Sequence, residues 1–223
     1  MKKIILLLAF LWSSLCYSQE MMHFRTVDFQ PIKPTNYTEV QGSPYFMDKD
    51  VYRTGVAVIS QNQVYKDDIK LLYNQVTDEI TFQYGKESPL AFSKRPVSFT
   101  IFSYGADGTK SDLLFSSGFP SAQDSKGTTY YQILAGQDTK LLKRTVKSIS
   151  ERKGYSSSTV SRVFQGETTY YLAGKDNDLK KISSYKDFMA LNGSMKTFID
   201  ENKLKKNSEE NFITLTNHYN SLK

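Results

Sequence analysis

The stretch Glu79-Ile-Thr-Phe-Gln-Tyr84 alternates polar and apolar side chains, and Val97-Ser-Phe-Thr-Ile101 shows the same alternation. Successive side chains of a strand point to opposite faces, so a period of two predicts a strand with one buried face. Between residues 37 and 183, turn-forming Gly, Asn and Asp residues separate further strand candidates, namely Val56–Ile59, Ile69–Tyr73, Tyr130–Leu134 and Thr169–Leu172. Roughly ten short strands at this spacing predict an antiparallel sheet, built as a sandwich or a partly open barrel.

Two similar segments occur within this β region. Residues 128–138 and 168–176 share Thr-Thr-Tyr-Tyr, Leu-Ala-Gly and Asp, which predicts two similar hairpins. Two copies are too few for a repeat array. Between them, Lys140-Leu-Leu-Lys-Arg-Thr-Val-Lys-Ser-Ile149 fits either a strand or a helical stripe, and its position after a turn favours a strand.

The hydrophobic period changes after Lys181, where the spacing predicts helices over Tyr185–Leu191, Met195–Asn202 and Glu209–Leu222. Ser194 and Ser208 are expected to cap the second and third helices with their hydroxyl groups. Residues 184–223 therefore form a helical appendage whose apolar faces need a partner surface, most simply the sheet. The predicted fold class is α+β, mainly β.

The first 18 residues are typical of a secretory signal peptide. Lys2 and Lys3 precede the apolar run Ile4–Trp12, and Cys16-Tyr-Ser18 is a small-x-small cleavage site, which predicts cleavage before Gln19. An uncleaved anchor and a lipoprotein modified at Cys16 are the alternatives. Residues 19–36 follow as an extended lead-in that adds an edge strand at most. No later apolar run is long enough to span a membrane.

Export changes the composition of the working protein. The full chain has 223 residues and a formal charge of +6, and its single Cys and single Trp both lie in the signal segment. Without Lys2 and Lys3 the charge falls to +4. A processed chain without cysteine has no disulfide, thiolate zinc site or cysteine nucleophile, so packing must stabilise it.

Motifs for catalysis or cofactor binding are absent from the sequence. His23 and His218 are far apart in sequence and neither has a second metal ligand at suitable spacing. No Gly-x-Ser-x-Gly motif and no glycine-rich phosphate loop occurs, so no cofactor is predicted. Turns explain Asp107–Asp112 and Asp176–Asp178 better than a calcium site does.

Carboxylate pairs leave a hydrolase open as an alternative, because a glycosidase needs only two acidic side chains that converge. The visible pairs are Asp67-Asp68, Asp78-Glu79 and Glu209-Glu210. Neighbours on a strand point to opposite faces, so solvated turn or cap roles are favoured for these pairs.

Positive charge is concentrated in residues 140–153, whereas residues 20–100 are nearly balanced. Six cations there oppose only Glu151, and they are candidate contacts for an anionic partner: Lys140, Lys143, Arg144, Lys147, Arg152 and Lys153. Such a stretch suits a polyanion or an acidic headgroup surface. A solvated basic strand edge that blocks aggregation is the alternative.

Several stretches together resemble a family of exported flavobacterial proteins. They are Gly42-Ser-Pro-Tyr-Phe46, Leu71-Leu-Tyr-Asn74 with Asp78-Glu-Ile80, Tyr130–Leu134 leading to Leu141–Arg144, and Phe198-Ile-Asp-Glu-Asn-Lys-Leu-Lys205 with His218-Tyr-Asn220. The resemblance covers nearly the whole processed chain. It implies a β domain followed by short helices in a cell-envelope or secreted protein, and it supplies no catalytic residue.

The sequence thus favours an exported, non-enzymatic binding or interaction module, with a hydrolase and a polyanion-binding or membrane-surface-binding protein as alternatives. The expected partner is an envelope protein, a glycan or a lipid headgroup, and nucleic acid is not expected. The expected location is the periplasm, the outer membrane or the extracellular space.

Overall fold

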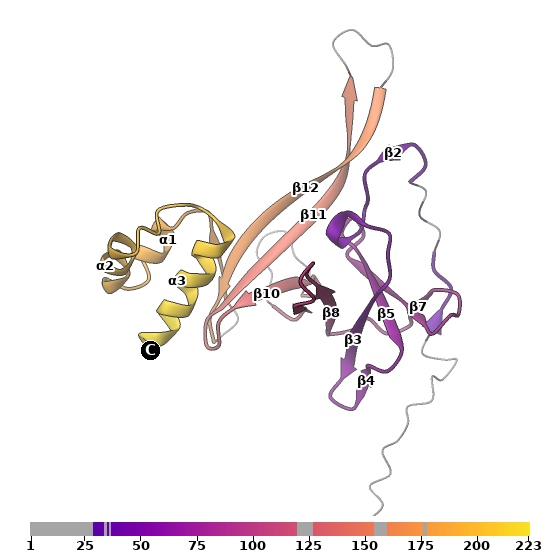
Figure 1. Ribbon diagram of the computed structural model, residues 1–223, viewed down its shortest axis with the longest axis horizontal. Coiled ribbons are helices and arrows are strands. Elements are labelled where there is room, and N and C mark those ends of the chain that lie inside the picture. Colours follow the sequence, from indigo (N-terminus) through magenta and orange to yellow (C-terminus); the bar gives the residue numbers. More distant parts are fainter. Residues whose placement is uncertain (1–28, 34, 36, 120–126, 154–159, 176–177) are drawn as a thin grey trace, which may run out of the picture.

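Strands dominate the computed structural model, which describes residues 29–33, 35, 37–119, 127–153, 160–175 and 178–223 (Figure 1). The predicted signal peptide, its cleavage site and His23 lie outside these residues. The strands are β1 (Phe29–Gln30), β2 (Val40–Gln41), β3 (Arg53–Ser60), β4 (Gln63–Tyr65), β5 (Ile69–Asn74), β6 (Glu79–Tyr84), β7 (Leu90–Phe92), β8 (Ser98–Tyr104), β9 (Lys110–Ser116), β10 (Tyr131–Ala135), β11 (Lys140–Lys153), β12 (Val160–Ala173) and β13 (Leu179–Ile182). Three helices follow: α1 (Lys186–Met189), α2 (Ser194–Glu201) and α3 (Glu209–Ser221). The predicted fold class is confirmed.

The described strands form one open, mostly antiparallel sheet in the order β1-β7-β6-β5-β3-β8-β9-β10-β11-β12-β13, with β4 paired to β3 and β2 parallel to β12. Strand β3 changes partner along its length, because Arg53 and Thr54 pair with β5 while the next residues pair with β8. Gly55 lies at this change, where a Cβ would stand 2.3 Å from the Thr100 carbonyl oxygen. The two neighbouring strands can approach this closely because glycine lacks a Cβ.

The first half of the sheet encloses an aromatic core. Phe82, Phe99 and Phe115 are buried there, and the Phe99 and Phe115 rings stack with centroids 4.7 Å apart. The predicted alternation of β6 is confirmed by buried Ile80 and Phe82. Val97 differs from its expected inward place: it precedes β8 and is 48% exposed.

Residues 140–149 are a strand, as their position after a turn predicted. They belong to β11, which pairs along its full 14 residues with β12. The two predicted hairpins are also confirmed, since β10 joins β11 and β12 joins β13. Their equivalent tyrosines, Tyr131 and Tyr171, meet edge to face at 5.7 Å.

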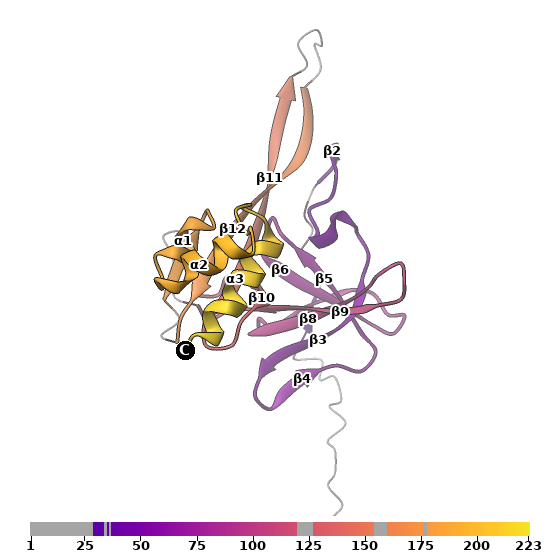
Figure 2. The ribbon, with the colours of Figure 1, turned by 60° about the vertical axis from the view of Figure 1, so that its left-hand side comes forward.

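The helices cover one face of the sheet at the base of the β11–β12 hairpin (Figure 2). Phe188, Ile199 and Phe212 share a buried cluster with Leu141 and Leu172, so the sheet is the partner of their apolar faces. The Ser208 hydroxyl accepts from the Asn211 amide and caps α3, as predicted.

The predicted cap of α2 is wrong. Ser194 is already the first helical residue, and the Asn192 side chain accepts from its amide. Because Ser194 already has a helical position, its hydroxyl is not at the N-cap, and the Asn192 side-chain oxygen binds the Ser194 amide from the preceding turn. Within the described residues, no helix has the length and apolar character needed to cross a membrane.

Candidate functional site

The six basic residues predicted to contact an anionic partner all lie on β11, but their surroundings differ. Lys147 is 7% exposed, and its ammonium group donates to the Ser43 carbonyl at 2.9 Å, the Tyr45 carbonyl at 2.6 Å and the Asp48 carboxylate at 2.6 Å. The Lys147 backbone amide also donates to the Gln75 carbonyl. Lys147 therefore ties the hairpin to the residues preceding β3.

Lys143 is bound by the helical cover. Its ammonium group lies 2.7 Å from Glu209 at the start of α3, and the Tyr170 hydroxyl donates to the same carboxylate oxygen at 2.9 Å. Burial and the neighbouring Glu209 raise the pKa of Tyr170 to about 12. This triad joins β11, β12 and the first helical turn of α3.

The remaining four basic residues are divided between the base and the outer end of β11. Desolvation raises the pKa of Asp78, and the positive charge of Arg144 is one of the contributions that oppose this rise. Lys140 is half-buried at the base, whereas Arg152 and Lys153 are exposed at the outer end. Three of the six basic residues, Lys143, Arg144 and Lys147, therefore act on carboxylates of this same chain.

The outer half of the hairpin, residues 148–153 with 160–167, extends past the sheet and the helices in both views (Figures 1 and 2). We call this part the arm. The Lys147 amide points away from β12, and the β11–β12 register has no bulge. The amide and carbonyl groups of every second residue point to the same edge of a strand, so those of Ile149, Glu151 and Lys153 also point away from β12. No described strand pairs with them.

Residues 37–41 lie along the β12 edge of the arm. Val40 and Gln41 pair with Arg162 and Val163, and Tyr37 meets Phe164 edge to face at 5.2 Å. On β11 opposite this contact and beyond it, Glu151, Arg152 and Lys153 are exposed, as is Val160 at the outer end of β12. The arm therefore ends in a largely solvent-facing two-stranded ribbon.

Asp78 is the centre of a partly buried polar cluster that the sequence analysis missed. It accepts from the Tyr73 hydroxyl at 2.7 Å and from Arg95 at 2.9 Å, while the Arg95 guanidinium lies 4.0 Å from the centroid of the Tyr130 ring. Desolvation raises the pKa of Asp78, and the bonds from Tyr73 and Arg95 oppose that rise. Both carboxylate oxygens are used within the fold, so the cluster joins β5, the turn before β6, the segment between β7 and β8 and the residue before β10. No local motif signals these contacts, because Arg95 and Tyr130 come from distant turns.

The other carboxylate pairs also occupy structural positions. Asp67 and Asp68 form the turn before β5, and Glu209 and Glu210 begin α3. Among the described residues, no group of three or more His, Cys, Asp and Glu side chains is placed to hold a metal ion. The Asp107 carboxylate accepts from the Thr109 amide and hydroxyl, as expected of a turn. Asp176 lies outside the described residues.

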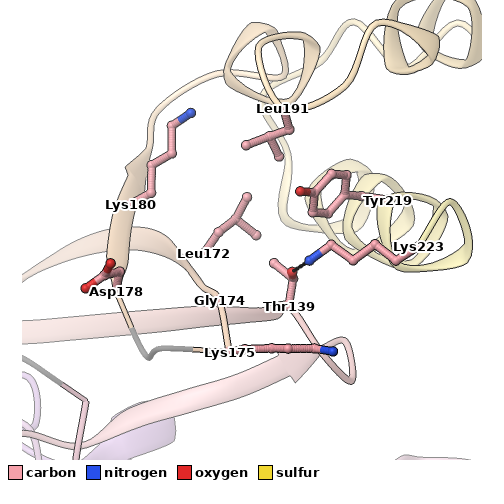
Figure 3. Close-up of a pocket in the computed structure, with 9 residues that line it drawn as sticks. All are labelled: Thr139, Leu172, Gly174, Lys175, Asp178, Lys180, Leu191, Tyr219 and Lys223. Carbon is pink, nitrogen blue, oxygen red and sulfur yellow. Dashed lines mark hydrogen bonds between the residues drawn. The ribbon is translucent and has the colours of Figure 1, made fainter.

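A cavity of about 220 Å³ lies where β12, β13 and α3 meet (Figure 3). Leu172, Leu191 and the Tyr219 ring form its apolar wall. Thr139 and three lysines, Lys175, Lys180 and Lys223, supply polar groups, with Asp178 as the one acidic side chain of the lining. The sequence analysis missed this cavity, because its walls come from separate hairpins and helices.

Comparisons of the chain with models of protein families, with curated proteins and with solved structures find no match. The resemblance to exported flavobacterial proteins therefore stays a prediction. What the structure defines is a class: a mainly β protein with an open sheet, a helical cover and a projecting two-stranded arm.

Proposed function

We propose that this protein is an exported, non-enzymatic interaction module that recruits an extended segment of an envelope protein along the outer edge of its arm. The single observation that carries the proposal is the row of outward backbone groups at Ile149, Glu151 and Lys153, against which no described strand lies. A strand with unpaired amides and carbonyls is a template for another strand.

The binding step is strand addition. A partner segment beside β11 would receive hydrogen bonds from the three outward amides and donate to the matching carbonyls. Arg152 and Lys153 lie next to that edge, are exposed, and make no ion pair with a described residue. These two cations favour a partner segment that carries acidic side chains, so they retain the role predicted for the basic stretch.

The internal use of charged groups supports a binding role over a hydrolase. Asp78 is engaged by Tyr73 and Arg95, and Glu209 is engaged by Lys143 and Tyr170. A hydrolase needs two carboxylates that both face a substrate. The export part of the proposal rests on residues 1–18, and sequencing the N-terminus of the protein recovered from the envelope or medium tests it: Gln19 is expected first.

The decisive variant is Glu151→Pro. Proline removes an amide that points away from β12, so the β11–β12 ladder keeps its hydrogen bonds while the outer edge loses a donor. Glu151→Ala removes the same carboxylate but keeps the amide, and it is the matched control. Crosslinking followed by capture from envelope fractions should recover a protein with the wild type and the alanine variant, with a recovery at least about tenfold lower for the proline variant.

The recovered protein is then added back to test the geometry. Amides of Ile149, Glu151 and Lys153 should exchange with deuterium more slowly in the complex, because a paired strand protects them. Equal recovery by all three forms would overturn the proposal. So would recovery of only glycans or lipids, or of no partner by the wild type under several salt conditions.

A further inference from the structure

We propose that the cavity between β12, β13 and α3 binds a small amphipathic anion, a carboxylate or phosphate group on a short apolar body. Its volume of about 220 Å³ is below the roughly 300 Å³ at which pockets for drug-sized ligands begin. The ligand is therefore the size of an aryl or short acyl acid.

The two halves of the cavity differ in chemistry (Figure 3). Leu172 is buried, and with Leu191 and the Tyr219 ring it makes a wall on which an apolar body can pack. The Tyr219 hydroxyl points into the space and makes no hydrogen bond to a described residue. Most ligand sites combine such an apolar lining with a few polar groups that orient the ligand.

Thr139 is the group that points most clearly to an anion. It is 4% exposed, and its backbone amide and carbonyl are both bound by the Asn220 side chain, at 2.9 and 2.8 Å. The Lys223 ammonium donates to its hydroxyl oxygen at 2.7 Å. A hydroxyl group also carries one proton to donate, and no described residue accepts it. A ligand oxygen would accept that proton beside a positive charge.

The charges of the lining also favour an anion, since three lysines oppose one aspartate. Lys175 is paired with Asp138 at 3.1 Å, whereas Lys180 makes no ion pair or hydrogen bond with a described residue. Lys180 and Lys223 come from β13 and from the end of α3, on opposite sides of the space in Figure 3. An anionic group that enters between them gains from both charges.

Matched probes test this inference with the full chain, by calorimetric titration. Benzoate and phenyl phosphate carry the two anionic groups, benzyl alcohol keeps the ring without the charge, and inorganic phosphate keeps the charge without the ring. One of the two aryl anions should bind at least about tenfold more tightly than benzyl alcohol and inorganic phosphate. Which of the two binds better distinguishes a carboxylate ligand from a phosphate ligand.

Variants then place the binding in this cavity. Lys180→Gln and Thr139→Val should each weaken the better aryl anion by about tenfold. Lys86→Gln removes an exposed charge from the turn after β6 and should leave binding unchanged. Thermal melts of every variant check folding, and Lys180→Gln keeps the test valid if Thr139→Val unfolds. Equal affinity for benzoate and benzyl alcohol, no binding at about 10 mM, or full affinity of Lys180→Gln would overturn the inference.

Discussion

Replacing Lys147 by methionine should destabilise the protein more than replacing any other lysine of β11. Methionine keeps an apolar stem of similar length but removes the ammonium group and its three hydrogen bonds to Ser43, Tyr45 and Asp48. Each hydrogen bond to a charged group contributes about 1.5–3 kcal/mol, and the contributions do not add fully. The two backbone carbonyls are half-buried and cannot recover full solvation.

Asp48 contributes less than the carbonyls. Its side chain is 81% exposed, so water solvates the carboxylate once the lysine is gone, and an exposed ion pair is worth only about 0–1 kcal/mol. We therefore expect Lys147→Met to lower the free energy of unfolding by about 2–3 kcal/mol and Asp48→Asn to lower it by at most about 1 kcal/mol. For a chain of this size the methionine variant should melt about 5–10 °C lower.

Urea unfolding, followed by circular dichroism, measures both changes. Lys153→Met is the control, because Lys153 lies on the same strand but is exposed and should change stability by less than about 0.5 kcal/mol. Hydrogen exchange adds a local readout: the Asp48 amide, which donates to the Tyr45 carbonyl, should lose protection in Lys147→Met. A methionine variant within about 0.5 kcal/mol of the wild type would refute the reasoning.

Two further predictions concern Gly55 in β3 and the contact of Tyr170 with α3. Gly55→Ala should lower the free energy of unfolding by about 2 kcal/mol or more, because the new Cβ would clash with the Thr100 carbonyl. Gly127→Ala is the control: no atom lies within 4 Å of its Cβ, so it should be nearly neutral in the same urea titration. The pKa of Tyr170 is about 12 in the folded chain against an unperturbed value of 10.0. This raised pKa stabilises the fold below pH 10, and that stabilisation is lost as the pH rises to about 12. Tyr170→Phe should therefore lose less stability than the wild type across that range, and parallel pH profiles of the two proteins would contradict the assignment.

Local sequence patterns predicted the strands and helices because each depends on neighbouring residues. Period-two alternation located β6 and β8, and the serine before Glu209 located the cap of α3. The cap of α2 was wrong for a local reason as well, since Ser194 is already helical and Asn192 binds the Ser194 amide from the turn before it. Propensity does not decide between two nearby side chains that both suit a cap.

Charged contacts could not be predicted in the same way. Lys143 and Lys147 are four residues apart in sequence and share a basic stretch, yet one binds Glu209 in α3 and the other binds residues 43–48. A run of basic residues in a sequence shows how much positive charge is present, but it does not show which carboxylates will form ion pairs with it in the folded chain. The same limit explains why the sequence analysis missed the Asp78 cluster, whose partners lie 17 and 52 positions away.

The sequence by itself determined the mainly β class, the change to helices after Lys181 and the two similar hairpins, because short-range periodicity and turn residues carry that information. Only the tertiary structure decided that β11 and β12 extend into an arm, that Lys147 is buried, and that separate elements line one cavity with Thr139 and Lys180. These features arise where segments distant in sequence pack together. Their energies depend on burial and on the pairing of buried polar groups, which no local pattern records.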